Sequence, residues 1–263
     1  MLTSDNLEDV RLRIRSGCFQ KNTSGLMPNL VQGNLVIMPK QWADEFIEFC
    51  RLNPKPCPVI GISKPGDPLI PELGNGLDIR IDVPEYHLFR EGVYDSAVSD
   101  INEYWANDSV AIVLGCSFSF EDALQSAGLP VRNIVQGTNV SMYDTNIATQ
   151  ATDNFSCNMV VSMRPFKKHN IDQVVKITSD FTKAHGAPVH IGDPRLIGIK
   201  DIHSPEYGSP VVLEEDDIPV FWACGVTTQA AIRSAKLPMV ITHAPGKMLI
   251  TDHQYKDLGV VNF

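Results

Sequence analysis

Two segments of the chain share one order of apolar and polar positions. VAIVL at residues 110–114 precedes GCSFSFEDALQSAGLP, and PVFWA at residues 219–223 precedes CGVTTQAAIRSAKLP. A shift of 108 residues places Cys116 on Cys224 and Ser119 on Thr227, with matching helical positions behind them. Continuous apolar runs are typical of strands buried on both faces, and the following spacing is helical. The pattern therefore predicts two related strand–cysteine–helix units, the second capped by Thr227 or Thr228.

The rest of the chain mixes helical and extended patterns. Helical spacing predicts helices at 5–16, 41–52 and 171–184. Apolar runs and alternation predict strands at 59–62, 79–83, 158–166, 196–199 and 239–242, an extended segment at 131–146, and a loop with short extended pieces at 22–39. We therefore expect an α/β protein with a mostly parallel sheet, helices on both faces, and a smaller inserted α+β domain.

The strand–helix–strand pattern between the two cysteine units suggests where the smaller domain lies. We place it at residues 131–205. Residues 1–130 and 206–263 then form a discontinuous main α/β domain.

Composition narrows the class of partner. The 263 residues are 43% hydrophobic and 20% charged, which is ordinary for a globular protein. A formal charge of -9 without a basic run argues against nucleic acid, although a small anionic substrate can still be bound by local dipoles and single arginines. An apolar stretch long enough for a membrane span and a signal peptide are both missing, so we expect a cytoplasmic protein. A second copy of the chain is a candidate partner, which would make a homo-oligomer.

Candidate chemistry gathers at predicted strand ends and in turns. A thiol at a helix N-terminus is expected to have a lowered pKa, and histidine suits acid–base work near neutral pH. The candidate catalytic residues are His190, His185, Cys224, His243 and Asp193. The candidate substrate-binding residues are Arg164, Cys116, Ser117, Ser119, Asn139, Tyr143, Thr227 and Thr228.

Metal and cofactor motifs are weak or absent in this sequence. His185, His190, Asp193 and His243 could supply ligands, but their spacing matches no zinc signature, so we predict no metal site. Neither strand leads into G-x-G-x-x-G, and the hydrolase elbow G-x-S-x-G and the phosphate loop are also missing. We therefore expect no bound cofactor.

Several longer motifs carry a family resemblance. GCSFSFEDAL, RNIVQGTNVSMY, VVSMRP, ITSDFTKAHGAPVHIGDP, PVFWACGVTTQ and ITHAPGKMLITD resemble the hydro-lyase family that includes the D-glutamate cyclases, from about residue 11 to 252. The resemblance implies a two-domain α/β lyase that removes water, and for the cyclase members it implies conversion of D-glutamate to 5-oxo-D-proline. Thr228, Lys247 and Asp144 depart from the residues more usual in the family. A missing cation at Asp144 points to a possible difference in substrate.

The residues and the resemblance combine into one hypothesis. Two helix N-termini and Arg164 would hold the carboxylates of a small amino or hydroxy acid, and a histidine, His190 first and His185 or His243 second, would deprotonate the ammonium. Cys224 could instead attack the carboxyl to form a thioester. One alternative is a cofactor-independent racemase or epimerase with Cys116 and Cys224 as its two bases. Another is a non-catalytic carboxylate-binding protein.

Overall fold

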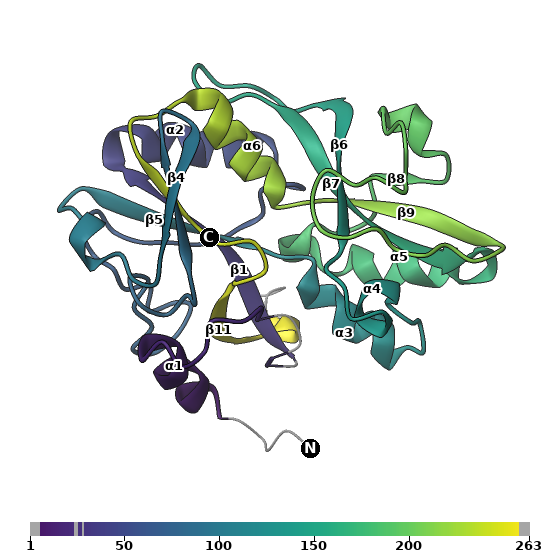
Figure 1. Cartoon of the computed structure of the whole chain (residues 1–263), viewed down its shortest axis with the longest axis horizontal. Helices are drawn as coiled ribbons and strands as arrows, with labels where there is room; N and C mark the ends of the chain where they lie inside the picture. Colours follow the sequence, from purple (N-terminus) through teal and green to yellow (C-terminus); the bar gives the residue numbers. More distant parts are fainter. Residues whose placement is uncertain (1–5, 24–25, 28, 258–263) are drawn as a thin grey trace.

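The computed structural model describes residues 6–23, 26–27 and 29–257, which form two β-sheets flanked by helices (Figure 1). The first sheet has the order β2 (Val59–Ile62), β5 (Ser109–Gly115), β1 (Leu30–Pro39), β10 (Val240–His243), β3 (Tyr86–Arg90) and β4 (Val93–Val98), and β11 (Leu249–Gln254) also pairs with β1. The second has the order β6 (Ser141–Ala148), β7 (Asn158–Lys167), β9 (Asp217–Ala223) and β8 (His190–Ile191).

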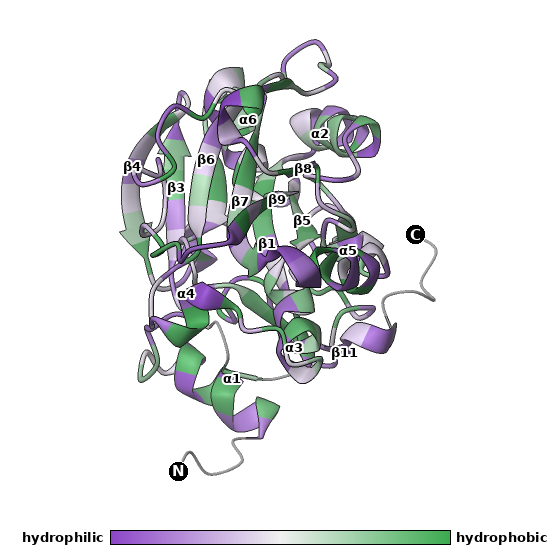
Figure 2. Cartoon of the chain, turned by 90° about the vertical axis from the view of Figure 1, so that its right-hand side faces the viewer, coloured by the Kyte–Doolittle hydropathy of each residue, from purple (hydrophilic) through white to green (hydrophobic). Residues whose placement is uncertain are grey.

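Helices pack against both sheets. The α-helices are α1 (Leu7–Arg15), α2 (Lys40–Leu52), α3 (Phe118–Ser126), α4 (Arg132–Val135), α5 (Ile171–Ser179) and α6 (Val226–Ala235). Short 3-10 helices span Asn102–Tyr104, Lys168–Asn170, Thr182–Ala184, Pro194–Ile197 and Tyr255–Asp257. Residues of α2 and α6 join the core of the first sheet, and residues of α3 and α5 pack on β7 and β9. In Figure 2 the flanking helices carry both hydrophobic and hydrophilic residues, as helices with one buried face do.

The predicted α/β class is confirmed, but the mostly parallel sheet is wrong. Within the described residues the strands pair antiparallel, including β1 with β5 and with β10, and β7 with β9. Strand β5 is buried along its whole length, which explains the error. A continuous apolar run indicates that both faces of a strand are buried. An antiparallel strand covered on both faces shows the same apolar run as a parallel strand, so the pattern does not give the strand direction.

Several local predictions also need correction. Residues 22–39 contain β1, the strand that pairs with three others in the first sheet. Residues 79–83 form turns, and residues 196–199 begin in a 3-10 helix. Helix α6 has Gly225 at its N-cap position, without a side-chain cap from Thr227 or Thr228. Short apolar segments do not distinguish strand from turn when the burial comes from distant parts of the chain.

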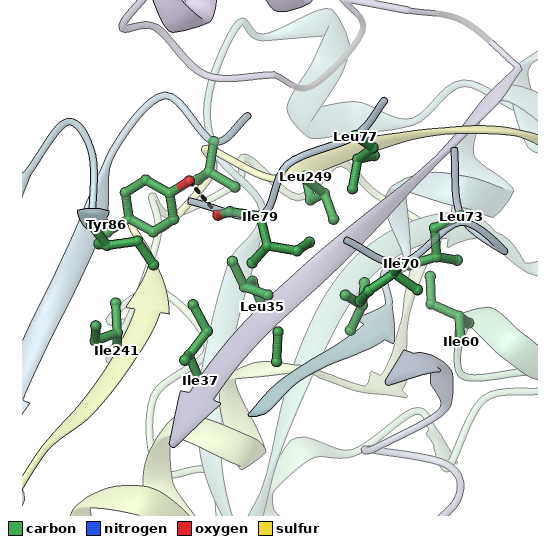
Figure 3. Close-up of a cluster of buried hydrophobic side chains, with 14 of the residues drawn as sticks. Leu35, Ile37, Ile60, Ile70, Leu73, Leu77, Ile79, Tyr86, Ile241 and Leu249 are labelled. Atoms are coloured by element: carbon green, nitrogen blue, oxygen red, sulfur yellow. Dashed lines mark hydrogen bonds between the residues drawn. The ribbon is translucent and has the colours of Figure 1, made fainter. Parts of the chain in front are cut away.

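The first sheet has a face covered mainly by irregular chain. Ile70, Leu73, Leu77 and Ile79 pack against the strands there, as Figure 3 shows. The Tyr86 hydroxyl donates a hydrogen bond of 2.6 Å to the carbonyl oxygen of Ile79, so the turn is tied to β3. The alternating apolar residues in 79–83 are therefore buried against the face of the sheet, and they do not form one of its strands.

Strand β9 belongs to the second sheet, where it lies between β7 and β8. The sequence-based division places residues 206–263 in the main domain instead, and that division stays a prediction. Helix α6 follows β9 directly and packs back on the first sheet. The β9–α6 turn therefore passes from one sheet to the other, and the β5–α3 turn makes the reverse crossing.

Candidate active site between the two cysteine turns

A small cavity lies where the two cysteine turns meet. It has a volume of about 50 Å³, and both Cys116 and Cys224 line it. The remaining lining side chains include Asn34 from β1, Ser117, Phe118, Asn139, His185, Gln229 and His243. The geometry therefore brings two thiols and two helix N-termini together at one cavity. Segments 108 residues apart in the sequence supply equivalent walls.

Each thiol occupies the N-terminus of its own helix. The backbone N–H of Phe118 interacts with the Cys116 sulfur, and those of Val226 and Gly225 interact with the Cys224 sulfur. Burial nevertheless raises the pKa of Cys116 to about 12 and raises the pKa of Cys224, because desolvation of the thiolate outweighs these donors. The expectation that the two thiols have a lowered pKa is wrong. Both sulfurs stay protonated at neutral pH.

His185 is held by the loop after α2. Its backbone is left-handed, with φ of 78°, and its Nδ1 lies 2.7 Å from the carbonyl oxygen of Lys55. A carbonyl only accepts, so Nδ1 carries the proton and Nε2 of the neutral ring has a free lone pair. Burial lowers the pKa of His185 to about 4, with a smaller opposing effect of the Lys55 contact. The ring is therefore neutral at pH 7.

His243 ends β10 and is tied to β1. Its Nδ1 lies 3.1 Å from the backbone nitrogen of Leu35 and 3.4 Å from the carbonyl oxygen of the same residue, and the tautomer decides which of the two is its partner. Burial lowers the pKa of His243 to about 4 as well. The cavity thus contains two neutral imidazoles, of which that of His185 can accept a proton at Nε2.

Arg164 lies behind the cavity wall and not in it. Its guanidinium is fully buried and pairs with Oε1 of Glu121 at 2.6 Å. The same guanidinium donates to the Ser117 hydroxyl at 3.0 Å, and its charge favours the thiolate form of Cys224. Arg164 therefore orients the β5–α3 turn and contributes a positive field, with its donors already engaged by protein groups.

The other predicted binding residues divide into those at the cavity and those in the framework. Asn139 lines the cavity, and its Oδ1 accepts from the backbone N–H of Val140 at 2.9 Å. Tyr143 donates to the carbonyl oxygen of Ile202, which ties β6 to a neighbouring loop. Ser119 is fully buried beside the Tyr255 ring.

The two threonines of the second cysteine unit, Thr227 and Thr228, form hydrogen bonds with backbone groups. The Thr227 hydroxyl donates to the carbonyl oxygen of Val160 at 3.2 Å and accepts from its N–H at 3.0 Å. The Thr228 hydroxyl donates to the carbonyl oxygen of Gly225 at 2.6 Å. Both side chains therefore join α6 to its own turn and to β7.

His190 and Asp193 lie together, away from the cavity. Nε2 of His190 is 2.8 Å from the carbonyl oxygen of Asp193, and the ring packs near Phe221 at the edge of the second sheet. The exposed carboxylate of Asp193 accepts from Arg195, which lowers the pKa of Asp193 to about 2. The structure therefore brings His185 and His243, but not His190, to the two thiols.

Asn34 is a cavity residue that sequence reasoning missed. Its Nδ2 donates to the carbonyl oxygen of Gly115 at 3.1 Å, and its carboxamide packs against Gly225. Asn34 therefore spans the two cysteine turns. A buried asparagine within the apolar run LVQGNLVIMP was the available signal, but the assignment of that run to a loop hid it.

The described residues contain no group of three or more His, Cys, Asp or Glu side chains arranged to hold a metal ion. Within the same residues, no helix is long and apolar enough to cross a membrane.

Comparison with known proteins places the cavity in a family context. A family model described as D-glutamate cyclase matches residues 110–252, which contain both cysteine turns and both cavity histidines. The chain belongs to the D-glutamate cyclase family. The resemblance inferred from the sequence motifs is thereby confirmed.

Relatives cover nearly the whole chain. One named "Putative hydro-lyase" from Aliivibrio salmonicida (strain LFI1238) is 52% identical over 256 residues, 97% of this chain and 98% of its own. Another with that name, from Bradyrhizobium sp. (strain BTAi1), is 56% identical over 240 residues, 91% of this chain and 88% of its own. A solved nitrogen repressor-like protein from Methanococcus jannaschii covers 94% of this chain and 98% of its own, but at 10% identity and a TM-score of 0.39 it supports no inference.

Proposed function

We propose that the protein is a hydro-lyase acting on a small amino carboxylate, and that it closes D-glutamate to 5-oxo-D-proline with loss of water. The observation that carries the proposal is the presence of two neutral histidines, His185 and His243, in one cavity with two helix N-termini. A cyclisation of this kind requires a base for the ammonium and a donor for the carboxyl oxygen. Family membership supports the same reaction class.

His185 is the base in this proposal, in place of His190. Its free Nε2 takes a proton from the substrate ammonium, and the amine then attacks the γ-carboxyl carbon to form the new C–N bond. The resulting imidazolium returns its proton to one carboxyl oxygen. The nitrogen loses a second proton to that same oxygen, the C–O bond breaks, and water leaves. Two protons pass from nitrogen to oxygen, so the reaction is balanced without an external reagent.

His243 and the helix N-termini stabilise charge on the carboxyl group. In the tautomer whose Nδ1 accepts from the Leu35 N–H, the Nε2–H of neutral His243 donates to an oxygen that becomes more negative as nitrogen attacks, which stabilises the transition state. Its lowered pKa keeps the ring neutral, so it acts as a donor and not as a proton source. The N-termini of α3 and α6 reinforce this stabilisation, because their dipoles favour negative charge.

The buried thiols favour direct attack by the amine over a thioester. A nucleophilic Cys224 needs its thiolate, and burial raises the pKa of that thiol. The shared position of Cys116 and Cys224 in the cavity favours one second candidate, the two-cysteine racemase. That reaction requires one of the two thiols to ionise against the same desolvation.

An NMR time course tests the proposal. We would incubate the protein with D-glutamate, and separately with L-glutamate, in deuterated buffer. Appearance of 5-oxo-D-proline, its loss by at least about 100-fold in His185→Gln, and its retention in His169→Gln are the expected results. His169 is an exposed histidine and serves as the matched control. Exchange at the α-carbon without lactam would replace the cyclase by the racemase, and no change in either enantiomer would contradict both.

A further inference from the structure

The carboxamide of Asn34 lines the cavity, and one backbone partner fixes which way it faces. The residue is only 7% exposed, and its Nδ2 donates a hydrogen bond of 3.1 Å to the carbonyl oxygen of Gly115. A carbonyl oxygen only accepts, so the nitrogen of the carboxamide faces Gly115 and Oδ1 takes the other position. Among the described residues no donor pairs with Oδ1. A buried acceptor without a donor costs free energy, so a ligand N–H is favoured at this oxygen.

The backbone that Asn34 contacts leads directly to the proposed base. Gly115 packs so closely on the chain before His185 that a Cβ on Gly115 would stand 1.7 Å from the carbonyl oxygen of Lys183. Lys183 precedes His185 by two residues, and both His185 and Asn34 line the same cavity. The unpaired acceptor on Asn34 and the free Nε2 of His185 therefore belong to one small site.

The cavity offers a substrate ammonium neutral partners. Among its described lining residues there is neither aspartate nor glutamate. A neutral oxygen orients an ammonium without stabilising its charge as strongly as a carboxylate does, and burial further disfavours the charged form. Both effects lower the pKa of a bound ammonium. This matters for His185, because burial lowers its own pKa to about 4 and makes it a weak base.

We propose that Asn34 is a substrate-binding residue whose Oδ1 accepts a hydrogen bond from the substrate ammonium and holds the nitrogen beside His185. This inference rests on the proposed function and gives that site a determinant for amino acids over carboxylic acids without the amine. After His185 removes one proton, the neutral amine still has an N–H for Oδ1. The contact therefore persists and orients the nitrogen lone pair for attack on the carboxyl carbon.

Two inert ligands isolate the contact with the ammonium. D-2-amino-4-sulfobutanoate and 4-sulfobutanoate both carry the α-carboxylate of glutamate and a sulfonate in place of the γ-carboxyl, and they differ only in the ammonium. The sulfonate keeps one negative charge but forms no lactam. Titration calorimetry would give their dissociation constants for the wild type, Asn34→Ala, Asn34→Asp and Asn107→Ala. Asn107 is an exposed asparagine outside the cavity lining and serves as the matched control.

The ratio of the two dissociation constants separates binding from structure. A distorted cavity weakens both ligands, because they share every group except the ammonium. Loss of a contact with the ammonium weakens only the amino ligand. Asn34→Asp keeps an acceptor oxygen whether or not its carboxyl group is protonated, so it tests rescue of the contact. Asn34→Leu, which conserves the side-chain volume, replaces Asn34→Ala if that variant does not fold.

We expect the preference for the amino ligand to fall by at least about tenfold in Asn34→Ala, because a hydrogen bond to a charged group is lost. Asn107→Ala should match the wild type, and Asn34→Asp should stay within about threefold of it or exceed it. An unchanged ratio in Asn34→Ala, a ratio as low in Asn34→Asp, or no binding of the amino ligand by the wild type would overturn the proposal.

These affinities do not depend on turnover. If D-glutamate fails to cyclise while the ratios change as expected, the proposed reaction is contradicted and the ammonium contact stands. If D-glutamate cyclises while the ratio in Asn34→Ala is unchanged, the reaction stands and the role of Asn34 is overturned.

Discussion

At the scale of single residues, backbone groups from distant parts of the chain hold the two cavity histidines. Nδ1 of His185 lies against the carbonyl oxygen of Lys55, and Nδ1 of His243 lies against the N–H and the carbonyl oxygen of Leu35. Burial lowers the pKa of both rings. The sequence names both residues as candidates, but their partners lie 130 and 208 residues away.

The buried histidines make stability depend on pH. The unfolded pKa is about 6.5, and burial lowers the pKa of both His185 and His243 to about 4, so the unfolded chain binds more protons between these values. The free energy of unfolding is therefore not reduced by these histidines above about pH 6.5, and it decreases as the pH falls toward 4. We expect urea unfolding to show a smaller loss over this window in His185→Gln than in the wild type. His169→Gln should behave like the wild type, and an identical slope in all three would contradict the assigned pKa.

The thiols provide a second residue-scale prediction. Because burial raises the pKa of Cys224, direct attack by the amine does not need its sulfur, and Cys224→Ser is expected to retain activity within about tenfold. The rate of lactam formation measures this. Cys18→Ser is the control, since Cys18 is exposed. Complete loss of turnover in a folded Cys224→Ser would instead support the thioester route.

At the scale of elements, two glycines allow the cysteine turns to approach their neighbours. A Cβ on Gly115 would stand 1.7 Å from the carbonyl oxygen of Lys183, and one on Gly225 would stand 2.5 Å from Nδ2 of Asn34. The first neighbour is backbone and the second is a side chain. The same type of turn therefore has different tolerances in the two units.

The glycine contrast predicts two different defects. Gly115→Ala should lower the free energy of unfolding by roughly 1–3 kcal/mol or more, since backbone must move. Gly225→Ala should be milder in stability but reduce activity by about tenfold, because Asn34 must leave its place between the turns. Urea unfolding and initial rates separate the two effects. Asn34→Ala supplies the control background, in which the added methyl meets no carboxamide. There Gly225→Ala should reduce activity little further, and an undiminished tenfold reduction would contradict the account.

At the scale of the whole molecule, the buried Arg164–Glu121 pair links the second sheet to α3. Arg164 lies on β7 and Glu121 in the first turn of α3, and both side chains are nearly inaccessible. Removing one partner of such a pair leaves an uncompensated charge in a medium of low polarity. The ion pair therefore holds the start of α3, where Phe118 lines the cavity, against β7.

Glu121→Gln is expected to lower the free energy of unfolding by about 3–5 kcal/mol, as measured by urea denaturation. Adding Arg164→Met should recover part of the loss by removing the orphaned charge. Asp78→Asn supplies the matched control, since its pair with Arg80 is half-buried and worth up to about 1 kcal/mol. Equal losses in Glu121→Gln and Asp78→Asn would contradict a structural role for the buried pair.

The sequence by itself determined the order of strand, cysteine turn and helix in each of the two cysteine units. It also determined the family to which the chain belongs. Apolar runs, a turn and helical spacing are encoded within about 25 residues, so both strand–cysteine–helix units could be predicted with their thiols at the helix starts. The motif resemblance also came from contiguous residues. These properties depend on neighbours in the chain.

Only the tertiary structure decided strand direction, the choice of histidine and the state of the thiols. Strand β1 pairs with β5 and with β10, and these partners lie far along the chain, so no local pattern specifies the antiparallel order. From the sequence we rank His190 ahead of His185, but the fold brings His185 and not His190 to the cavity with Cys116 and Cys224. Burial then reversed the expected acidity of the thiols, because desolvation depends on everything packed around a group and not on its position in a helix.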